Sequence, residues 1–220
     1  VAIESILNKR GTACNNNFES LLYRSMHSSP EAFAHRVAEL IDRLARLTRE
    51  LQFVHGLNPA QWEALRFLAR ANRYSRSPGA LAEFLGTTKG TASQTLIALE
   101  NKGYVARARS DSDRRAMHLA LTPAGHALLE RDPILTIEQA AGRLTAEVGN
   151  PLVQGLSRLL HDLQHKNGIK EFGVCGHCTL LCVKSDAAAV SNSSQCGMTG
   201  DALSEDDVAR LCVNFQRHDA

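Results

Sequence analysis

The chain has 220 residues and an apolar content of 44%, which is enough for one or two domains that each bury a core. No run of about 18 apolar residues occurs, which excludes a membrane-spanning helix, and the N-terminal residues lack the apolar core of a secretory signal, so we expect a cytoplasmic protein. The net charge of +2 is too small to indicate nucleic-acid binding by itself.

The first part of the chain predicts two amphipathic helices. Residues 1–30 contain several helix breakers and are treated as an N-terminal extension. A helix is expected from Glu31 to His55, because its apolar residues recur on one face while charged residues fill the other. Asn58 and Pro59 are well placed to begin the next helix, in which Trp62 is expected to anchor a core.

The segment from Ser77 to Gly103 predicts two short helices separated by a tight turn. Ser77 is a favourable N-cap, and Pro78 follows at the first helical position. Gly86 comes after the last apolar residue of this helix, where a left-handed glycine ends a helix at no steric cost. Thr88 can cap the second helix, which is expected to end at Gly103.

The outer face of the second helix carries small, donor-rich side chains and no acid before Glu100. A helix that enters the major groove of DNA needs this composition. Short residues allow close approach, amides and hydroxyls can bond base edges, and a cation can bind phosphate. The candidate DNA-contacting residues of this helix are Thr88, Lys89, Thr91, Ser93 and Gln94.

A two-stranded hairpin is predicted directly after this helix pair. Residues 104–109 alternate with period two, a polar turn follows, and a second alternating run ends at Leu121. The arms and the tip carry four arginines that suit phosphate or minor-groove contacts. These arginines are Arg107, Arg109, Arg114 and Arg115.

Two further helical segments are expected after the hairpin. One begins at Thr122 and is interrupted at Pro133, and the last begins at Asn150-Pro151 and ends near Gly168. The first and last long helices of the chain each have apolar residues left over after one stripe is buried on their own chain. This surplus predicts that both helices pack on a partner chain.

Three stretches resemble the MarR-type winged helix-turn-helix regulators. They read LNPAQWEALRFLA before the helix pair, LAEFLGTTKGTASQTLIALENKGYV within it and SDSDRRAMHLALTPAGHALLE after it. The most specific part is the D-x-D-R-R wing followed by LTPAG, and the resemblance covers roughly Glu31 to Lys166. The alternative is an amphipathic helix pair and a hairpin in an unrelated all-α domain.

The resemblance implies a homodimer in which the first and last helices interlock across a two-fold axis. It implies binding to pseudo-palindromic double-stranded DNA through paired recognition helices, about 34–36 Å apart. It also implies a small-molecule effector, since such proteins hold ligands between the dimer helices and the DNA-binding lobe. No residue here marks such a pocket.

The end of the chain differs from the rest in both cysteine content and charge. Five of the six cysteines lie in the last 46 residues. From residue 168 onward four Lys and Arg stand against seven Asp and Glu, so this part carries −3 and residues 1–167 carry +5. An acidic tail is expected to lie away from DNA, and clustered cysteines in a reducing compartment favour metal or redox chemistry over disulfides.

The cysteine pattern is C-x2-C-x17-C-x15-C, formed by Cys175, Cys178, Cys196 and Cys212, with Cys182 as a substitute for one of them. Four thiolates fit either a structural zinc ion or an iron–sulfur cluster. The wide second spacing is similar to high-potential iron–sulfur proteins, whereas zinc sites usually show two close pairs. Free or disulfide-forming thiols are the third alternative.

The sequence therefore predicts a mainly α protein with three parts: the extension 1–30, a MarR-like winged-helix DNA-binding and dimerisation domain 31–167, and a cysteine-rich metal- or cluster-binding tail 168–220. The expected function is DNA-binding transcriptional regulation, modulated by a metal or redox centre or by a small ligand. The alternative is an iron–sulfur or metal-binding redox protein with a vestigial DNA-binding domain. An enzyme is not expected, because no nucleophile–base pair, phosphate loop or open metal triad is found.

Overall fold

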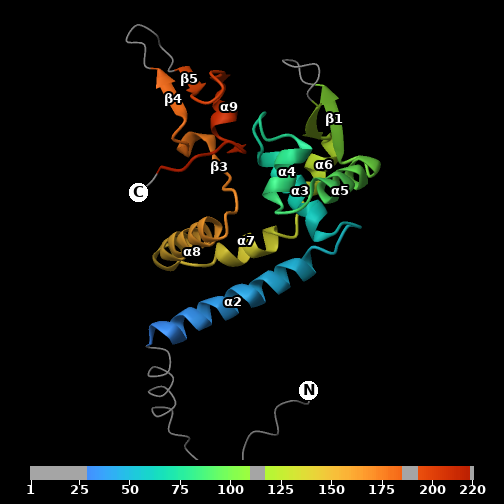
Figure 1. The fold of residues 1–220 in the computed structure, drawn as a ribbon. Coiled ribbons are helices and arrows are strands. Elements are labelled where there is room, and N and C mark those ends of the chain that lie inside the picture. Colours follow the sequence, from blue (N-terminus) through green and yellow to red (C-terminus); the bar gives the residue numbers. More distant parts are fainter. Residues whose placement is uncertain (1–28, 110–116, 185–192, 219–220) are drawn as a thin grey trace, which may run out of the picture. The chain divides into compact units, whose positions relative to one another are not determined.

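The computed structural model describes residues 29–109, 117–184 and 193–218. In these ranges the chain is mainly helical and has three small antiparallel sheets (Figure 1). This confirms the predicted fold class. The chain packs as two compact units, residues 1–48 and residues 49–220. Among the described helices, none is both long enough and apolar enough to cross a membrane.

Helix α2 (Pro30–Leu51) makes up the described part of the first unit and reaches into the second. It is strongly amphipathic, yet none of its side chains is buried. Its apolar face stays open: Phe33 is 66% exposed and Leu44 is 57% exposed. The helix ends at Leu51, four residues before the predicted His55. His55 and Gly56 lie in the following turn and adopt left-handed φ angles of 55° and 69°.

The helix-turn-helix is built from α3 (Pro59–Arg70), α4 (Pro78–Phe84) and α5 (Lys89–Asn101). These helices share one core. Its largest fully buried side chains include Trp62, Phe67, Leu65, Leu81, Leu96 and Leu99. Trp62 is thus a core anchor, as predicted.

The predicted helix starts are confirmed by their caps. Asn58 and Gln61 form a reciprocal capping box at the start of α3. The Ser77 hydroxyl accepts from the backbone N–H of Ala80 at 3.1 Å. Gly86 has φ of 60° at the end of α4, so it supplies the predicted left-handed residue.

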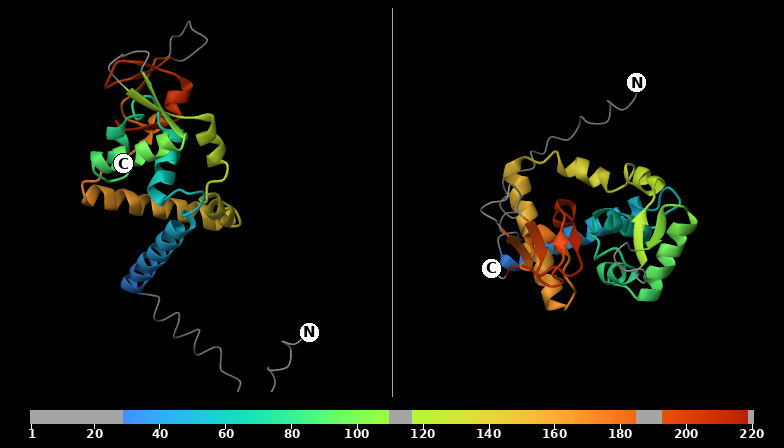
Figure 2. Two further views of the ribbon diagram at one scale, coloured as in Figure 1. Left: turned by 90° about the vertical axis from the view of Figure 1, so that its right-hand side faces the viewer. Right: turned by 90° about the horizontal axis from the view of Figure 1, so that it is seen from above.

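Strands β1 (Val105–Arg109) and β2 (Met117–Leu121) pair antiparallel, with Val105 opposite Leu121, and form the predicted wing. The paired strands are seen in yellow-green in both views of Figure 2. The wing turn, residues 110–116, lies outside the described residues. Helix α6 (Pro123–Leu129) starts against the base of β1, where a Cβ on Gly125 would meet the Tyr104 carbonyl oxygen at 2.2 Å. Only glycine fits there.

The chain then continues through α7 (Leu135–Ala141) and α8 (Ala146–Lys166). The predicted break at Pro133 is confirmed. The predicted start of the last helix at Asn150-Pro151 is wrong, because α8 begins at Ala146 and Pro151 lies inside it. A proline lacks one backbone donor but its fixed φ is helical, so a helix can contain one where its neighbours compensate.

A buried ion pair ties the α6–α7 connection to α3. Arg66 donates from Nη1 to both oxygens of Asp132, at 2.9 and 3.2 Å, and from Nη2 to Gln52 at 2.8 Å. The Asp132 side chain is only 4% exposed and also accepts from the Ile134 backbone. This network fixes where the chain leaves the helix-turn-helix.

The residues after Gly168 fold into short elements, which we call the cysteine module (residues 173–216). Strands β3 (Gly173–Val174) and β7 (Leu211–Cys212) pair antiparallel. Strands β4 (Leu181–Lys184), β5 (Ser193–Cys196) and β6 (Ala202–Leu203) form a second sheet. The short helices η1 (Cys175–His177) and α9 (Glu205–Val208) complete the module. Ser204 and Asp207 form a reciprocal capping box at the start of α9.

A candidate nucleic-acid interface and a cysteine site

The start of α5 brings the candidate recognition residues together on one exposed surface. The Thr88 hydroxyl caps the helix by accepting from the Thr91 backbone N–H at 3.1 Å. Lys89, Thr91 and Gln94 are exposed, and Ser93 is half-buried. These side chains are therefore available to a ligand along the first two turns of the helix.

The opposite face of α5 explains why this surface points outward. Ala92, Leu96 and Leu99 are fully buried in the core shared with α3 and α4. Helical spacing places the polar residues between them on the other side. The Thr95 hydroxyl donates to the Thr91 carbonyl at 3.1 Å, so it is used within the helix.

The predicted wing arginines are only partly described. Arg107 forms a 2.5 Å ion pair from Nε to Glu100, near the end of α5, and so connects β1 with the candidate recognition helix. Arg109 lies in β1, but its side chain is outside the described part, as are Arg114 and Arg115. Their DNA contacts stay predictions.

The four predicted ligand cysteines are all buried, whereas Cys182 is exposed. Cys175, Cys196 and Cys212 share one cluster with Leu203, and all five described cysteines are free thiols. Within the described ranges, no three His, Cys, Asp or Glu side chains are arranged to hold a metal ion. Their role as metal ligands therefore stays a prediction.

Backbone donors point at several of these sulfurs. Gln216 donates its N–H to the Cys178 sulfur at 3.3 Å, and Asn214 donates to the Cys212 sulfur at 3.4 Å. Burial alone would raise the pKa of Cys196, but hydrogen bonds from the Thr199 and Met198 backbone bring it below its ordinary value.

The surroundings of Cys175 shift the pKa of its thiol in the opposite direction. Burial raises the pKa of its thiol to about 11, and the neighbouring thiols of Cys212, Cys178 and Cys196 add to the rise. Simultaneous ionisation of these sulfurs is therefore unfavourable without a compensating positive charge.

The cysteine module is hydrogen-bonded to the loop between α3 and α4. The buried Ser75 hydroxyl donates to the Leu211 carbonyl at 3.1 Å and accepts from the Val213 N–H at 2.8 Å. The Asn72 N–H also donates to the Leu211 carbonyl, at 2.9 Å. Sequence reasoning missed Ser75 and Asn72, because nothing local distinguishes them from ordinary loop residues.

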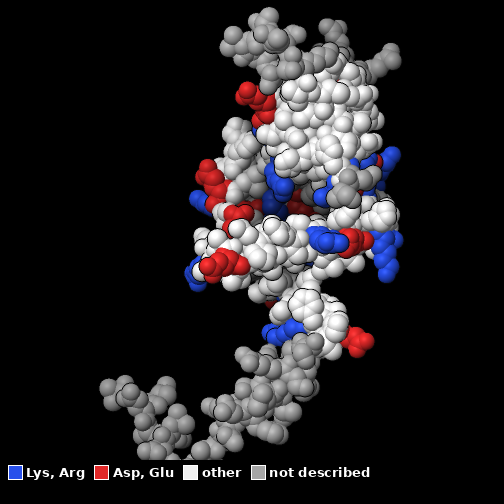
Figure 3. Space-filling model, turned by 90° about the vertical axis from the view of Figure 1, so that its left-hand side faces the viewer, with Lys and Arg blue, Asp and Glu red and all other residues white. Residues whose placement is uncertain are grey.

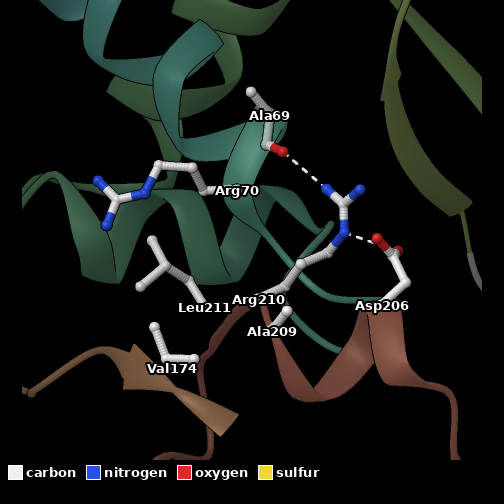
Figure 4. A pocket seen from close by; sticks show the side chains of 7 residues that line it. All are labelled: Ala69, Arg70, Val174, Asp206, Ala209, Arg210 and Leu211. Carbon is white, nitrogen blue, oxygen red and sulfur yellow. Dashed lines mark hydrogen bonds and ion pairs between the residues drawn. The ribbon is translucent and has the colours of Figure 1, made fainter. Parts of the chain in front are cut away.

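Further ion pairs and polar contacts lie beside these hydrogen bonds between the cysteine module and the loop after α3. Arg210 donates from Nη1 to the Ala69 carbonyl at 2.7 Å and from Nε to Asp206 at 2.6 Å, beside a small pocket at the end of α3 (Figure 4). The Tyr74 hydroxyl donates to Asp201 at 2.9 Å. The last turn of α3 thus contacts Arg210, which follows α9, and the loop after α3 contacts the turn before β6.

The connection between α8 and the module also packs on the helix-turn-helix. The Phe172 ring lies edge-on to the rings of Phe67 and Phe84, with centroids 5.9 and 5.3 Å away. Lys170 pairs with Glu83 of α4 at 2.6 Å. This connection is therefore anchored on both apolar and charged contacts.

His161 and His165 lie four residues apart on α8. Their rings stack on α8, and His161 contacts Glu171, which also pairs with Arg217 at 3.0 Å. Burial would raise the pKa of Glu171, but hydrogen bonds from Arg217 and His161 hold it below its ordinary value. These contacts tie α8 to the end of the module.

One face of the cysteine module carries few charged side chains. On the face shown in Figure 3, charged side chains are sparse over the sheet formed by β4, β5 and β6. A surface that binds nucleic-acid backbone needs clustered lysines or arginines. The described face of the module lacks that feature.

Known proteins are similar to the central part of the chain. Residues 55–116 match the family model described as MarR family. The transcriptional repressor MprA of Escherichia coli K12 is 36% identical over 74 residues, which are 34% of this chain and 42% of that protein. The HTH-type transcriptional regulator PrsX of Escherichia coli is 31% identical over 86 residues, 39% of this chain and 50% of that protein.

A comparison with solved structures gives a match over a longer part of the chain. The crystal structure of Streptococcus pneumoniae FabT in complex with DNA is 22% identical, has a TM-score of 0.49 and covers 62% of this chain and 99% of that one. The matched part of this chain spans only about half or less of the length of MprA and PrsX.

Proposed function

We propose that the chain is a transcriptional regulator of the MarR type that binds pseudo-palindromic duplex DNA as a homodimer, in keeping with the match of residues 55–116 to the MarR family model. The observation that carries this proposal is the two-sided nature of α5. One face is buried in the core through Ala92, Leu96 and Leu99, and the other exposes Lys89, Thr91 and Gln94.

The homodimer is supported by two long helices with open apolar faces. On α2, Phe33, Leu40, Ile41, Leu44 and Leu47 are each more than a third exposed. On α8 the same holds for Val148, Leu152, Val153, Leu156, Leu160 and Leu163. Contiguous apolar surface of this kind marks an interaction site, and a second copy of the chain offers the matching surface.

A two-fold axis between two copies would place two α5 helices about 34–36 Å apart, which matches one turn of DNA. In this proposal the protein acts in the cytoplasm, responds to a small molecule or to its cysteine site, and has no catalytic activity. The repressor MprA and the regulator PrsX, by their names, support regulation rather than catalysis.

The experiment selects bound duplexes from a random library with the purified full chain, and then measures their affinity by fluorescence anisotropy. Wild-type protein is expected to select an inverted repeat. Gln94→Ala should change the preferred base at one position in each half-site, at a cost of about 1–3 kcal/mol for the original base. Gln139→Ala, an exposed glutamine of α7, is the matched control and should leave the preference unchanged.

A second variant tests the electrostatic contact. Lys89→Ala should weaken binding to every sequence and reduce the salt slope by about one unit, whereas Lys166→Ala at the end of α8 should not. A chain that is monomeric and selects no duplex at low ionic strength overturns the proposal. That outcome would favour the metal-binding redox protein with a vestigial DNA-binding domain.

A further inference from the structure

We propose that Arg66 is a positioning residue for DNA recognition. Its guanidinium holds together the two places where the chain enters and leaves the winged helix, and it thereby sets the separation of the two α5 helices in the dimer. Arg66 itself contacts no DNA and acts through Gln52 and Asp132. Its effect on DNA binding rests on the proposed function, whereas its contacts within the fold do not.

Three segments that are far apart in the sequence meet at the Arg66 side chain. Gln52 is the first residue after α2, Arg66 belongs to α3, and Asp132 lies in the connection between α6 and α7. The guanidinium donates from Nη2 to Gln52 Oε1 at 2.8 Å. It donates from Nη1 to the two carboxylate oxygens of Asp132, at 2.9 and 3.2 Å. One side chain therefore joins the winged helix at both of its ends.

These contacts are largely shielded from water. Gln52 is 4% exposed, and the side chains of Asp132 and Arg66 are 4% and 21% exposed. Among the ion pairs of the described residues, this pair has both the least exposed carboxylate and the least exposed cation. A buried charge that loses its partner is strongly destabilising, so alternative arrangements of the two segments are disfavoured.

The shape of the guanidinium makes the contact directional. An arginine presents its N–H donors as a rigid planar fork, whereas a lysine presents one point charge on a flexible stem. Gln52 and Asp132 must therefore lie in fixed directions from α3 for both to be bonded. Asp132 is itself held, because its Oδ1 accepts from the Ile134 N–H at 2.9 Å, directly before α7. The start of α7 is thus oriented by α3.

A second contact links the entry segment to the candidate recognition helix. Lys102, the residue that follows α5, donates from Nζ to the Gly56 carbonyl and to Gln61 Oε1, the latter at 3.5 Å. The segment between α2 and α3 is therefore held to α3 through Gln52 and to the end of α5 through Gly56. A displacement of this segment is passed to both helices.

Both long helices with open apolar faces are connected to the winged helix at this point. Helix α2 ends one residue before Gln52, and α7 and α8 follow Asp132 in the chain. In the proposed dimer, the direction of these connections determines how far apart the two α5 helices lie. One base pair adds about 3.4 Å along the DNA axis, so a change of a few ångström alters the half-site spacing that fits.

The first experiment measures the preference for half-site spacing with the purified full chain. Duplexes carry the two half-sites of the selected repeat, with one or two base pairs added to or removed from the spacer. Wild type should bind the altered spacings about tenfold more weakly. Arg66→Lys keeps a charge beside Asp132 but loses the fork, and should reduce this discrimination about fivefold. The matched control Arg70→Lys, an exposed arginine of α3, should retain it.

The double variant Arg66→Met with Asp132→Leu separates positioning from stability. It removes both charges, so it should keep a cooperative urea transition and bind an isolated half-site within about twofold of wild type. It should nevertheless show the relaxed spacing preference of Arg66→Lys, because nothing then joins the two ends of the winged helix. Wild-type discrimination in either variant overturns the positioning role of Arg66.

A measurement without DNA distinguishes failure of this inference from failure of the proposed function. A spin label is attached at Thr91 on α5 through an alkyne-bearing amino acid, because the native cysteines preclude thiol labelling. Pulsed electron paramagnetic resonance should give one narrow interchain distance for wild type, and Arg66→Lys should widen this distribution about twofold. Equal widths overturn the positioning role while the dimer stands. A wild type that gives no interchain distance and selects no duplex overturns the proposed function instead.

Discussion

The backbone N–H of Val213 donates a 2.8 Å hydrogen bond to the Ser75 hydroxyl, although 138 residues separate the two. The single proton of this hydroxyl has two acceptors within reach, the Leu211 carbonyl at 3.1 Å and Asn72 Oδ1 at 2.9 Å. One fully buried serine therefore holds the last strand of the cysteine module against the loop before α4.

Ser75→Ala should lower the free energy of unfolding of the full chain by about 1–3 kcal/mol, because it leaves the buried Val213 N–H without its acceptor. Urea denaturation at neutral pH measures this loss. The control Thr136→Val removes a hydroxyl from the exposed face of α7 and should change stability by less than about 0.5 kcal/mol. Similar losses in the two variants would contradict the assigned role of Ser75.

The ion pair of Arg66 and Asp132 gives a second stability prediction. Asp132→Leu leaves the guanidinium of Arg66, whose side chain is only 21% exposed, without its carboxylate. The expected loss is about 3–5 kcal/mol, whereas the double variant Arg66→Met with Asp132→Leu should recover most of it. Thermal unfolding of wild type, of the two single variants and of the double variant measures these differences in stability. A double variant as unstable as the single one argues against the ion pair as the cause.

Glu171 predicts a dependence of stability on acid pH. Burial opposes ionisation, but Arg217 and His161 hold the pKa of Glu171 below its ordinary value. The stabilisation from the ionised carboxylate is therefore complete above about pH 5 and is lost as the pH falls through the lower folded-state pKa. Urea midpoints of wild type and Glu171→Gln should differ at pH 7 and converge on acidification. A constant gap down to pH 3 would exclude this carboxylate as the cause.

The open face of α8 predicts the effect of a charge on association. Leu160 is 59% exposed, and Leu160→Lys should shift the chain from dimer to monomer and abolish duplex binding at the same concentration. Sedimentation velocity measures the assembly state. Asp162→Lys, an exposed change on the same helix, is the control. An unchanged dimer of Leu160→Lys would place the interface elsewhere.

The wing turn carries Arg115, which lies outside the described residues. Arg115→Ala should weaken binding to all duplexes alike and flatten the salt slope by about one unit, because a phosphate contact carries no sequence information. Arg131→Ala, an exposed arginine after α6, is the control. An unchanged slope would remove the wing tip from the contact set.

The helix-turn-helix was predictable because its signals are local. Ser77 and Thr88 each accept from a backbone N–H three residues later, and Gly86 supplies its left-handed φ within the same short stretch. Caps and apolar spacing act over one or two turns, so a single sequence reveals them. The outward face of α5 follows from the same spacing.

The position of the cysteine module was not predictable for the opposite reason. Its contacts join Leu211 and Val213 to residues far back in the chain, and no local pattern marks Asn72 or Ser75 as their partners. The ion pair of Arg107 with Glu100 was missed for the same reason. An arginine in a wing is expected to bind phosphate, and the sequence does not show that a carboxylate lies beside it. The predicted helix start at Asn150-Pro151 was wrong because a proline is favoured at a helix start but can also lie inside a helix.

The packing of Phe172 limits where the chain can be truncated without disturbing the winged helix. Its ring meets those of Phe67 and Phe84, so a fragment ending at residue 168 would expose two aromatic faces of the winged helix to water. Such a truncation would therefore report on aggregation of a damaged lobe as much as on loss of the cysteines. A cut after Phe172 would keep the aromatic trio intact and give the cleaner dissection.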